Sequence, residues 1–274
     1  MYFHKKRYIW LSTMKTKMKK INLFVFFIVL YSCACKGQVH RFYYELTYKP
    51  STKNKTIKTD IFYLDSLDKR SVFIRKEKWE SDSLFTTQSP VLSLGTMNFK
   101  VIKDLGNSSV ILKDDLFIGV ISYKEYPDLH WKLLPEKRNT GTFQVQKAEA
   151  NYGGRHWIAW FTQDIPVFDG PYVFMGLPGL IIELKDANNE YQWKLKGSKK
   201  NVRSTLQTES VMDESLMSKE AYIKNKENFI NDPLPVLMQS MADVSKSLEI
   251  MNKMNQQAEA IKKYHRENDN TIER

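Results

Sequence analysis

Gly170-Pro-Tyr-Val-Phe-Met-Gly-Leu-Pro-Gly-Leu-Ile-Ile-Glu-Leu-Lys-Asp186 is the stretch of this chain that carries the most specific information about its fold. Glycine permits backbone conformations and close approaches that other residues cannot reach, and proline fixes φ and removes a donor. The pattern predicts a defined turn that leads into a buried strand over Leu180–Leu184. Because the stretch lacks an ordinary nucleophile and a metal-ligand cluster, we interpret it as a fold determinant. Its structural motif consists of Gly170, Pro171, Gly176, Leu177, Pro178, Gly179, Leu180 and Ile181.

The composition suits one globular domain with an appended helical part, since 42% of the 274 residues are hydrophobic and 27% are charged. The net charge of +11 is unevenly placed, because residues 1–37 hold eight basic residues and no acidic residue. Without these eight, 34 basic and 31 acidic residues remain, a net charge of +3. The sequence therefore does not indicate nucleic-acid binding.

The first 37 residues read as a leader with a secretory signal peptide. Lys15–Lys20 is a basic region, and Ile21–Tyr31 is an apolar run that is too short for a convincing transmembrane helix. Leu30-Tyr-Ser-Cys33 also resembles a bacterial lipobox, which would make Cys33 a lipid anchor. Ordinary cleavage would instead leave a soluble protein that begins near Gln38. We expect an exported protein, periplasmic or at the cell surface, soluble or lipid-anchored.

Both cysteines of the chain, Cys33 and Cys35, lie in this leader. The rest of the chain therefore has no intrachain disulfide framework and no thiolate chemistry. In an exported protein, other interactions in the core must hold the fold.

From Val39 onward the dominant pattern has a period of two residues, which is typical of strands. Short strands separated by turn signals predict a mainly β (α+β) domain over residues 38–210, with a curved or partly closed antiparallel β-sheet. No glycine-rich phosphate loop opens a helix, so nucleotide binding is not indicated. The predicted strands are Arg41–Tyr48, Thr56–Leu64, Ser71–Lys78, Leu84–Gln88, Met97–Lys103, Ser109–Lys113, Leu116–Tyr123, Leu129–Leu134, Thr142–Asn151, Gly154–Gln163, Gly179–Asp186 and Glu190–Gly197.

Residues 211–274 form a predicted helical segment that packs against the sheet or on itself. One helix is expected within Met212–Asn231, and Asp232-Pro233 supplies an N-cap and a first position for a second helix. The second helix carries an apolar seam that could instead dock a partner, as in an assembly component. The polar tail from Asn255 is expected to fray. The seam residues are Leu237, Met241, Val244, Leu248 and Met251.

Catalytic chemistry has one candidate group in the sequence. His156, Asp164 and Glu183 could form the acid–base group of a hydrolase. Alternatively, the segment is an aromatic strand whose alternate residues fill the core while His156 or Arg155 faces water. The chain has no zinc-binding motif and no nucleophile elbow, so we expect no metal and no cofactor.

An aromatic concentration near the glycine–proline stretch is the candidate ligand-binding site. It could line an apolar or carbohydrate-binding cleft, or it could be core, because aromatic side chains dominate β-sheet cores. Its members are Trp131, Trp157, Trp160, Phe161, Phe168, Tyr172 and Phe174.

Gly176-Leu-Pro-Gly-Leu-Ile181 matches, letter for letter, the motif of the GLPGLI family of exported proteins from Bacteroidetes. The chain resembles that family from Val39 to about residue 210. The resemblance implies an exported, mostly β protein without an assigned activity, and it supplies no catalytic residue. Further elements of the pattern are Trp131-Lys-Leu, Val145-Gln-Lys-Ala148, Gly154-Arg155, Ala159-Trp-Phe-Thr162, Asp164-Ile-Pro166 and Gly170-Pro171.

Together these patterns favour a non-enzymatic cell-envelope protein that binds an apolar ligand or a protein partner. The alternatives are a hydrolase that uses His156, Asp164 and Glu183, or an assembly component that docks through the helical seam. Contact with a membrane is expected only through a lipid anchor at Cys33.

Overall fold

The computed structural model describes residues 38–84, 97–116, 119–204, 206, 216–239 and 248–273. Val39–Arg274 forms one compact unit. The predicted leader with Cys33, the seam residues Met241 and Val244, and most of the predicted strand Leu84–Gln88 lie outside the described residues.

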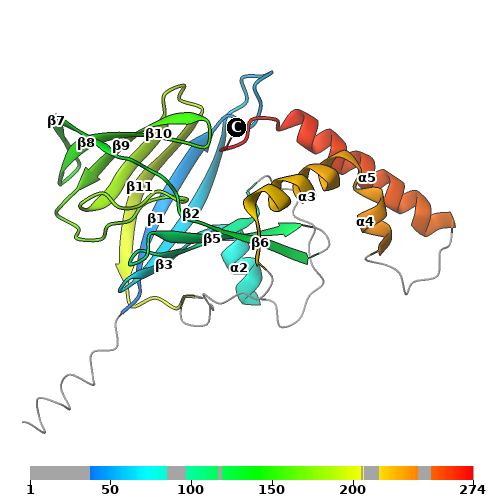
Figure 1. The fold of residues 1–274 in the computed structure, drawn as a ribbon, viewed down its shortest axis with the longest axis horizontal. Coiled ribbons are helices and arrows are strands. Elements are labelled where there is room, and N and C mark those ends of the chain that lie inside the picture. The colour runs from blue at the N-terminus through cyan, green and yellow to red at the C-terminus, as the bar shows by residue number, and fades with distance from the viewer. Residues whose placement is uncertain are drawn as a thin grey trace, which may run out of the picture. The chain divides into compact units, whose positions relative to one another are not determined.

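The protein is mainly β, as the sequence predicts (Figure 1). Three helices, α3, α4 and α5, follow the strands, and α2 lies between β3 and β4. The strands are β1 His40–Tyr48, β2 Lys58–Leu67, β3 Arg70–Arg75, β4 Phe99–Asp104, β5 Ser109–Leu116, β6 Gly119–Glu125, β7 Lys132–Thr140, β8 Phe143–Tyr152, β9 Arg155–Thr162, β10 Leu180–Asp186, β11 Tyr191–Lys200 and β12 Leu216–Met217. The helices are α2 Lys76–Leu84, α3 Lys219–Asn231, α4 Leu234–Gln239 and α5 Leu248–Glu267.

All of these strands belong to one sheet of 12 strands in the order β12-β6-β5-β4-β3-β2-β1-β11-β10-β9-β8-β7. The pairings are antiparallel except at one edge, where β12 runs parallel to β6. The central strand β1 pairs with β2 on one side and with β11 on the other, so the first and last long strands lie side by side.

The sheet is strongly curved. Tyr152 on β8 donates a hydrogen bond of 2.5 Å to Glu125 on β6, although β8 and β6 lie near opposite ends of the strand order. Such a contact requires the sheet to curl round until its two ends approach. The main hydrophobic core lies inside the curl and gathers side chains from β1 to β11.

The glycine–proline stretch fills the inside of this curl, and its strand is β10, as predicted. Tyr172, Val173 and Phe174 are all buried there. Gly179 has φ +148°, and a Cβ at this position would lie 1.9 Å from the carbonyl oxygen of Thr162. A side chain at residue 179 is therefore excluded by backbone that cannot move aside.

Two local predictions are wrong. The predicted strand Ser71–Lys78 ends at Arg75, and α2 begins at Lys76. Here Trp79 packs edge-on against Tyr63 of β2, so tertiary packing on the sheet overrides the local pattern. The predicted strand Leu129–Leu134 begins only at Lys132, where pairing with β8 starts.

The helical segment has a small core of its own. Its first helix, α3, begins after the N-cap Ser218, and Asp232 caps the C-terminal end of α3 rather than the start of α4. The seam is split, because Leu237 is fully buried whereas Leu248 is 77% exposed. None of the helices in the described ranges is both long and apolar enough to span a membrane. The small core consists of Phe229, Leu237, Met254, Ala258 and Ile261.

The prediction that the tail frays from Asn255 is also wrong. Helix α5 continues to Glu267, and the next six residues, Asn268–Glu273, are bound to the sheet. We call Asn268–Glu273 the rim segment. Its two asparagines, Asn268 and Asn270, are buried by hydrogen bonding rather than by hydrophobicity, which a hydrophobic pattern does not register.

Candidate functional site

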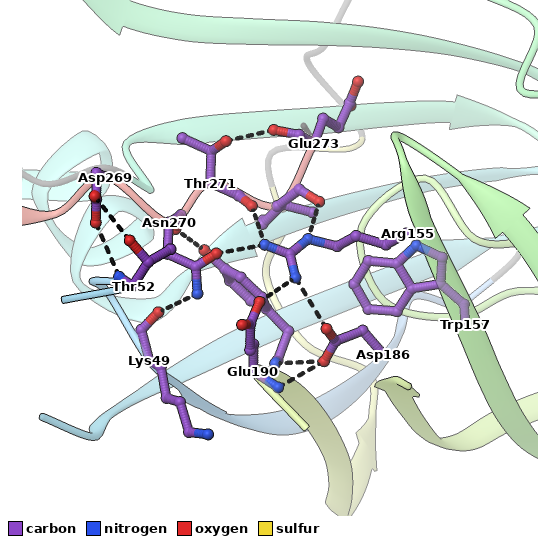
Figure 2. Close-up of polar contacts among 12 residues, drawn as sticks. Lys49, Thr52, Arg155, Trp157, Asp186, Glu190, Asp269, Asn270, Thr271 and Glu273 are labelled. Carbon is purple, nitrogen blue, oxygen red and sulfur yellow. Dashed lines mark hydrogen bonds and ion pairs between the residues drawn. The ribbon is translucent and has the colours of Figure 1, made fainter. Parts of the chain in front are cut away.

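The rim segment lies across turns at one end of the sheet, and these turns form a binding site for it (Figure 2). Three of its side chains, Asn268, Asn270 and Ile272, are at most 8% exposed. We call the residues that hold it the rim site. They are Lys49, Pro50, Ser51, Thr52, Gly153, Tyr152, Arg155, Tyr172, Tyr191 and Lys219.

Arg155 is the centre of the rim site. Its Nε donates to the carbonyl oxygen of Ile272 at 2.9 Å, and one terminal nitrogen donates to the carbonyl oxygen of Thr271 and to Oδ1 of Asn270, both at 2.6 Å. Two of these three acceptors are main-chain atoms. Arg155 therefore recognises mainly the path of the bound backbone, and only at Asn270 a side chain.

The other terminal nitrogen of Arg155 faces the β10–β11 turn. It donates to Asp186 at 2.9 Å and to Glu190 at 2.7 Å, so all of the five guanidinium N–H groups can be engaged. Asp186 in turn accepts the backbone N–H groups of Glu190 and Tyr191. The turn thus fixes the carboxylates, and the carboxylates fix the arginine.

The local sequence explains the position of Arg155. Gly153 and Gly154 have φ of +56° and +72° and turn β8 into β9, which starts at Arg155. A Cβ on Gly153 would lie 2.7 Å from Cγ of Glu273, so glycine also makes room for the bound segment.

Asn270 is bound through both its side chain and its backbone. Its Nδ2 donates to the carbonyl oxygen of Lys49, and its backbone N–H donates to that of Pro50. Its own carbonyl oxygen accepts the Tyr191 hydroxyl at 2.5 Å. An aspartate here would lose the amide donor, so the site discriminates for an amide.

Asp269 binds the loop after β1. Its carboxylate accepts the backbone N–H of Thr52 at 2.9 Å and the hydroxyls of Thr52 and Ser51. These hydrogen bonds, the N–H of Thr52 foremost, hold the pKa of Asp269 well below its usual value.

Glu273 enters a cluster of tyrosines beside a lysine. The hydroxyl of Tyr172 donates to it at 2.5 Å, and Nζ of Lys219 lies 2.8 Å away. The hydroxyl oxygen of Tyr152, which donates its proton to Glu125, lies 3.1 Å away. Burial, together with the Glu273 carboxylate, raises the pKa of Tyr172. Burial opposes the charge of Lys219, but hydrogen bonds to Glu125 and Glu273 raise its pKa. The cluster therefore forms a binding site for a carboxylate.

Tyr172 belongs to both the glycine–proline stretch and the rim site. It has φ of +54°, an uncommon conformation for an aromatic residue. This strained conformation directs the phenol of a core loop to the bound segment, so the two features are physically connected.

The structure separates the residues of the predicted aromatic site into buried, partly buried and exposed side chains. Trp157, Phe161, Tyr172 and Phe174 are at most 4% exposed and pack inside the curl, where Trp157 meets Phe174 with a centroid distance of 4.8 Å. Phe168 is 55% exposed. Two others are partly buried and contact polar groups: Trp131 donates to the Met175 carbonyl, and Trp160 lies under Arg138.

The structure does not bring the hydrolase residues together. His156 contacts Asn151 at 2.9 Å, whereas Glu183 pairs with Arg138 at 2.6 Å. Glu183 lies opposite Trp160 in the sheet, four positions from His156, which is roughly 13 Å along the strand. Asp164 lies further along and accepts the backbone N–H of Gln144.

The sequence analysis missed Arg155, for which it allowed a solvent-facing position. Arg155 is 4% exposed and shares the inner face of β9 with Trp157, Ala159 and Phe161. That alternation was the available signal, because an arginine on an apolar face needs partners. Within the described residues, no cluster of histidine, aspartate and glutamate is placed to hold a metal ion.

Comparisons with known proteins assign no activity. The model of a family described as "Protein of unknown function (Porph_ging)" matches residues 153–183, which include Arg155 and the Gly176–Ile181 motif. This match does not confirm the GLPGLI name. No curated protein matches the chain.

Among solved structures, PNGF-II in the C2 space group has a TM-score of 0.50 at 12% sequence identity, over 68% of this chain and 32% of that chain. PNGF-II in the P21 space group has a TM-score of 0.48 at 13% identity with the same coverage. This chain thus spans about a third of the length of PNGF-II. The first likeness shows a related fold and nothing more.

Proposed function

We propose that this protein is an exported, non-enzymatic binding protein of the cell envelope that holds a peptide segment of a protein partner at the rim site. Its own rim segment is the resident occupant of that site. The observation that carries the proposal is the set of contacts through which Arg155, Tyr191 and the loop after β1 bind main-chain atoms of a six-residue segment.

The contacts define the peptide that the site would accept. Main-chain hydrogen bonds give affinity for any peptide whose backbone follows the path of the rim segment, and pockets select among side chains. The site requires an amide at the position of Asn270, a buried aliphatic group at Ile272 and a carboxylate at Glu273. The partner segment would therefore carry asparagine, then an aliphatic residue two positions later, then an acid.

The filled hydrophobic core favours a protein partner over an apolar ligand. Trp157 and Phe174 fill the curl together with the glycine–proline stretch, and their rings contact each other. Phe168, the exposed aromatic of the predicted set, lies two residues before that stretch.

A fluorescent peptide with the sequence of Asn268–Glu273 tests the proposal. The receptor is the full chain with Asn270→Ala and Ile272→Ala, which weaken the resident segment and leave the rim site intact. We expect saturable binding by anisotropy, at least tenfold tighter than to the unsubstituted chain.

Two controls define the result. A peptide with aspartate at the position that corresponds to Asn270 should bind weakly. Adding Arg155→Lys to the receptor should abolish binding. Equal binding of both peptides, or no binding to a receptor with a native circular dichroism spectrum, would contradict the proposal.

Export is proposed from the leader and has its own test. Fractionation of cells that make the full chain should place it in the periplasm or at the cell surface. Cys33→Ala distinguishes the two forms, since it should release a lipid-anchored protein and leave a soluble one unchanged. Retention of the full chain in the cytoplasm would contradict export.

A further inference from the structure

We propose that Lys103 and Asp169 condense to an intramolecular amide, so that a covalent crosslink joins β4 to the residue that directly precedes the glycine–proline stretch. Nζ of Lys103 lies 2.5 Å from Oδ1 of Asp169, and both side chains are 0% exposed. The crosslink is a modification of the core and is independent of the peptide site proposed above.

The two oxygens of Asp169 have different surroundings. Oδ1 accepts the backbone N–H of Gly170 at 2.8 Å and also contacts the lysine. Oδ2 is buried and has no hydrogen-bond partner among the described residues. A carboxylate oxygen without a donor in a dry core is costly, so this pair is poorly stabilised as ions.

The surroundings favour the neutral, nucleophilic form of the Lys103 amine. Phe73 lies with its ring centroid 6.0 Å from Nζ of Lys103, and the neighbouring core is aromatic. Burial lowers the pKa of Lys103, which favours the free amine that acts as a nucleophile. Besides Asp169, the Lys103 amine contacts the carbonyl oxygen of Gly170, at 2.6 Å.

The reaction balances without any co-reactant. Nζ attacks Cγ of Asp169, the Nζ–Cγ bond forms and the Cγ–Oδ2 bond breaks. Taken from the ion pair, Nζ gives up two protons, and Oδ2 leaves with both as water. Oδ1 remains as the amide oxygen, and the Gly170 N–H stabilises the charge that develops on it.

Proximity lowers the activation barrier, which is high for this reaction between separate groups in water. Two groups held in contact in a folded core react with effective molarities of about 10⁵–10⁸ M, provided that they are well oriented. The product also removes an unsatisfied buried oxygen. In a chain whose cysteines both lie in the leader, such a bond would supply the covalent lock that a disulfide cannot.

Mass spectrometry of the folded full chain, denatured and digested with trypsin, tests the proposal. We expect one branched peptide that contains Lys103 and Asp169 and is lighter than its two linear parts by one water, with no cleavage after Lys103. Lys226 and Asp114, an ion pair of 2.7 Å with a partly exposed lysine, serve as the internal control and should yield only linear peptides.

Two variants complete the test. Asp169→Asn should form the same bond with loss of ammonia instead of water, and Lys103→Arg should form none. The crosslink is expected in the majority of folded wild-type molecules. If most folded wild-type molecules yield both linear peptides, the proposal is wrong. This measurement on the wild type does not depend on whether either variant folds.

Discussion

Arg155 and Lys103 are both buried cations that face an aspartate, but they differ in how completely their partners are satisfied. Arg155 donates to five acceptors, and Asp186 accepts two backbone N–H groups besides the arginine. The Lys103–Asp169 pair leaves one buried oxygen without a hydrogen-bond partner in the described part of the chain.

The comparison separates two ways in which this protein could hold a segment in place. A saturated guanidinium fixes a peptide reversibly, since each hydrogen bond can be exchanged for one to water or to a second peptide. An incompletely satisfied pair in a dry core is suited to covalent closure. We therefore propose reversible exchange of peptide segments at the rim site and a permanent covalent bond at the core pair.

The largest effect is expected from removing the geometry that both regions share. Gly179→Val places a side chain against the Thr162 carbonyl and displaces the stretch that carries Tyr172 and that directly follows Asp169. We expect loss of soluble, folded protein on expression, measured by circular dichroism of the soluble fraction. A native spectrum at wild-type yield would remove this stretch as the fold determinant.

The core pair should respond to loss of one partner more than to loss of both. Neither Lys103→Met nor Lys103→Met combined with Asp169→Leu can form the crosslink. Lys103→Met leaves Asp169 buried without a countercharge, so its free energy of unfolding should be about 3–5 kcal/mol lower than that of the double variant. Chemical denaturation of the two variants measures this difference, and equal stability of the two would contradict the expected cost of the unpaired carboxylate.

Arg155→Lys should release the rim segment while the sheet stays folded. A lysine keeps the charge but cannot reproduce the fork of donors, and the lost hydrogen bonds to charged and main-chain acceptors cost about 2–3 kcal/mol. Limited proteolysis should then cleave within Asn268–Glu273 first. Lys185→Arg, on an exposed pair with Asn189, is the matched control and should leave the protease pattern unchanged.

Acid should loosen the same segment. The pKa of Asp269 is lowered in the folded protein, so its contribution is present above the ordinary aspartate pKa and is lost as pH falls below about 4. The protection factors of the amides of residues 268–273, taken relative to the intrinsic exchange rate at each pH, should fall in that range in the wild type. Asp269→Asn should remove this dependence, and an identical pH response in the variant would rule out Asp269 as its origin.

Local patterns predicted the strands well because period-two alternation reports which face is buried. Leu180–Asp186 and Phe143–Tyr152 are strands close to their predicted bounds. The same reasoning failed at Lys76–Leu84, where Trp79 packs a helix against Tyr63. It predicted a curved sheet but not which strands approach each other across the curl, because the contact of Tyr152 with Glu125 depends on the whole strand order.

The candidate site was predicted only in part, for a physical reason. Tyr172 belongs to both the predicted aromatic set and the rim site. Arg155 and Asn270 were missed because each is buried by polar contacts with residues far away in the chain, such as Thr271 for Arg155 and Lys49 for Asn270. Polar burial of this kind leaves no periodicity in a hydrophobic pattern.

Exchange at the rim site can be observed most directly in the unsubstituted full chain. Hydrogen exchange of residues 268–273 is measured with and without a large excess of the peptide Asn-Asp-Asn-Thr-Ile-Glu. The account predicts that the peptide displaces the resident segment, whose amides then exchange faster, while those of β9 and β11 keep their protection. Unchanged exchange in the rim segment at saturating peptide would contradict the claim that this site binds peptides reversibly.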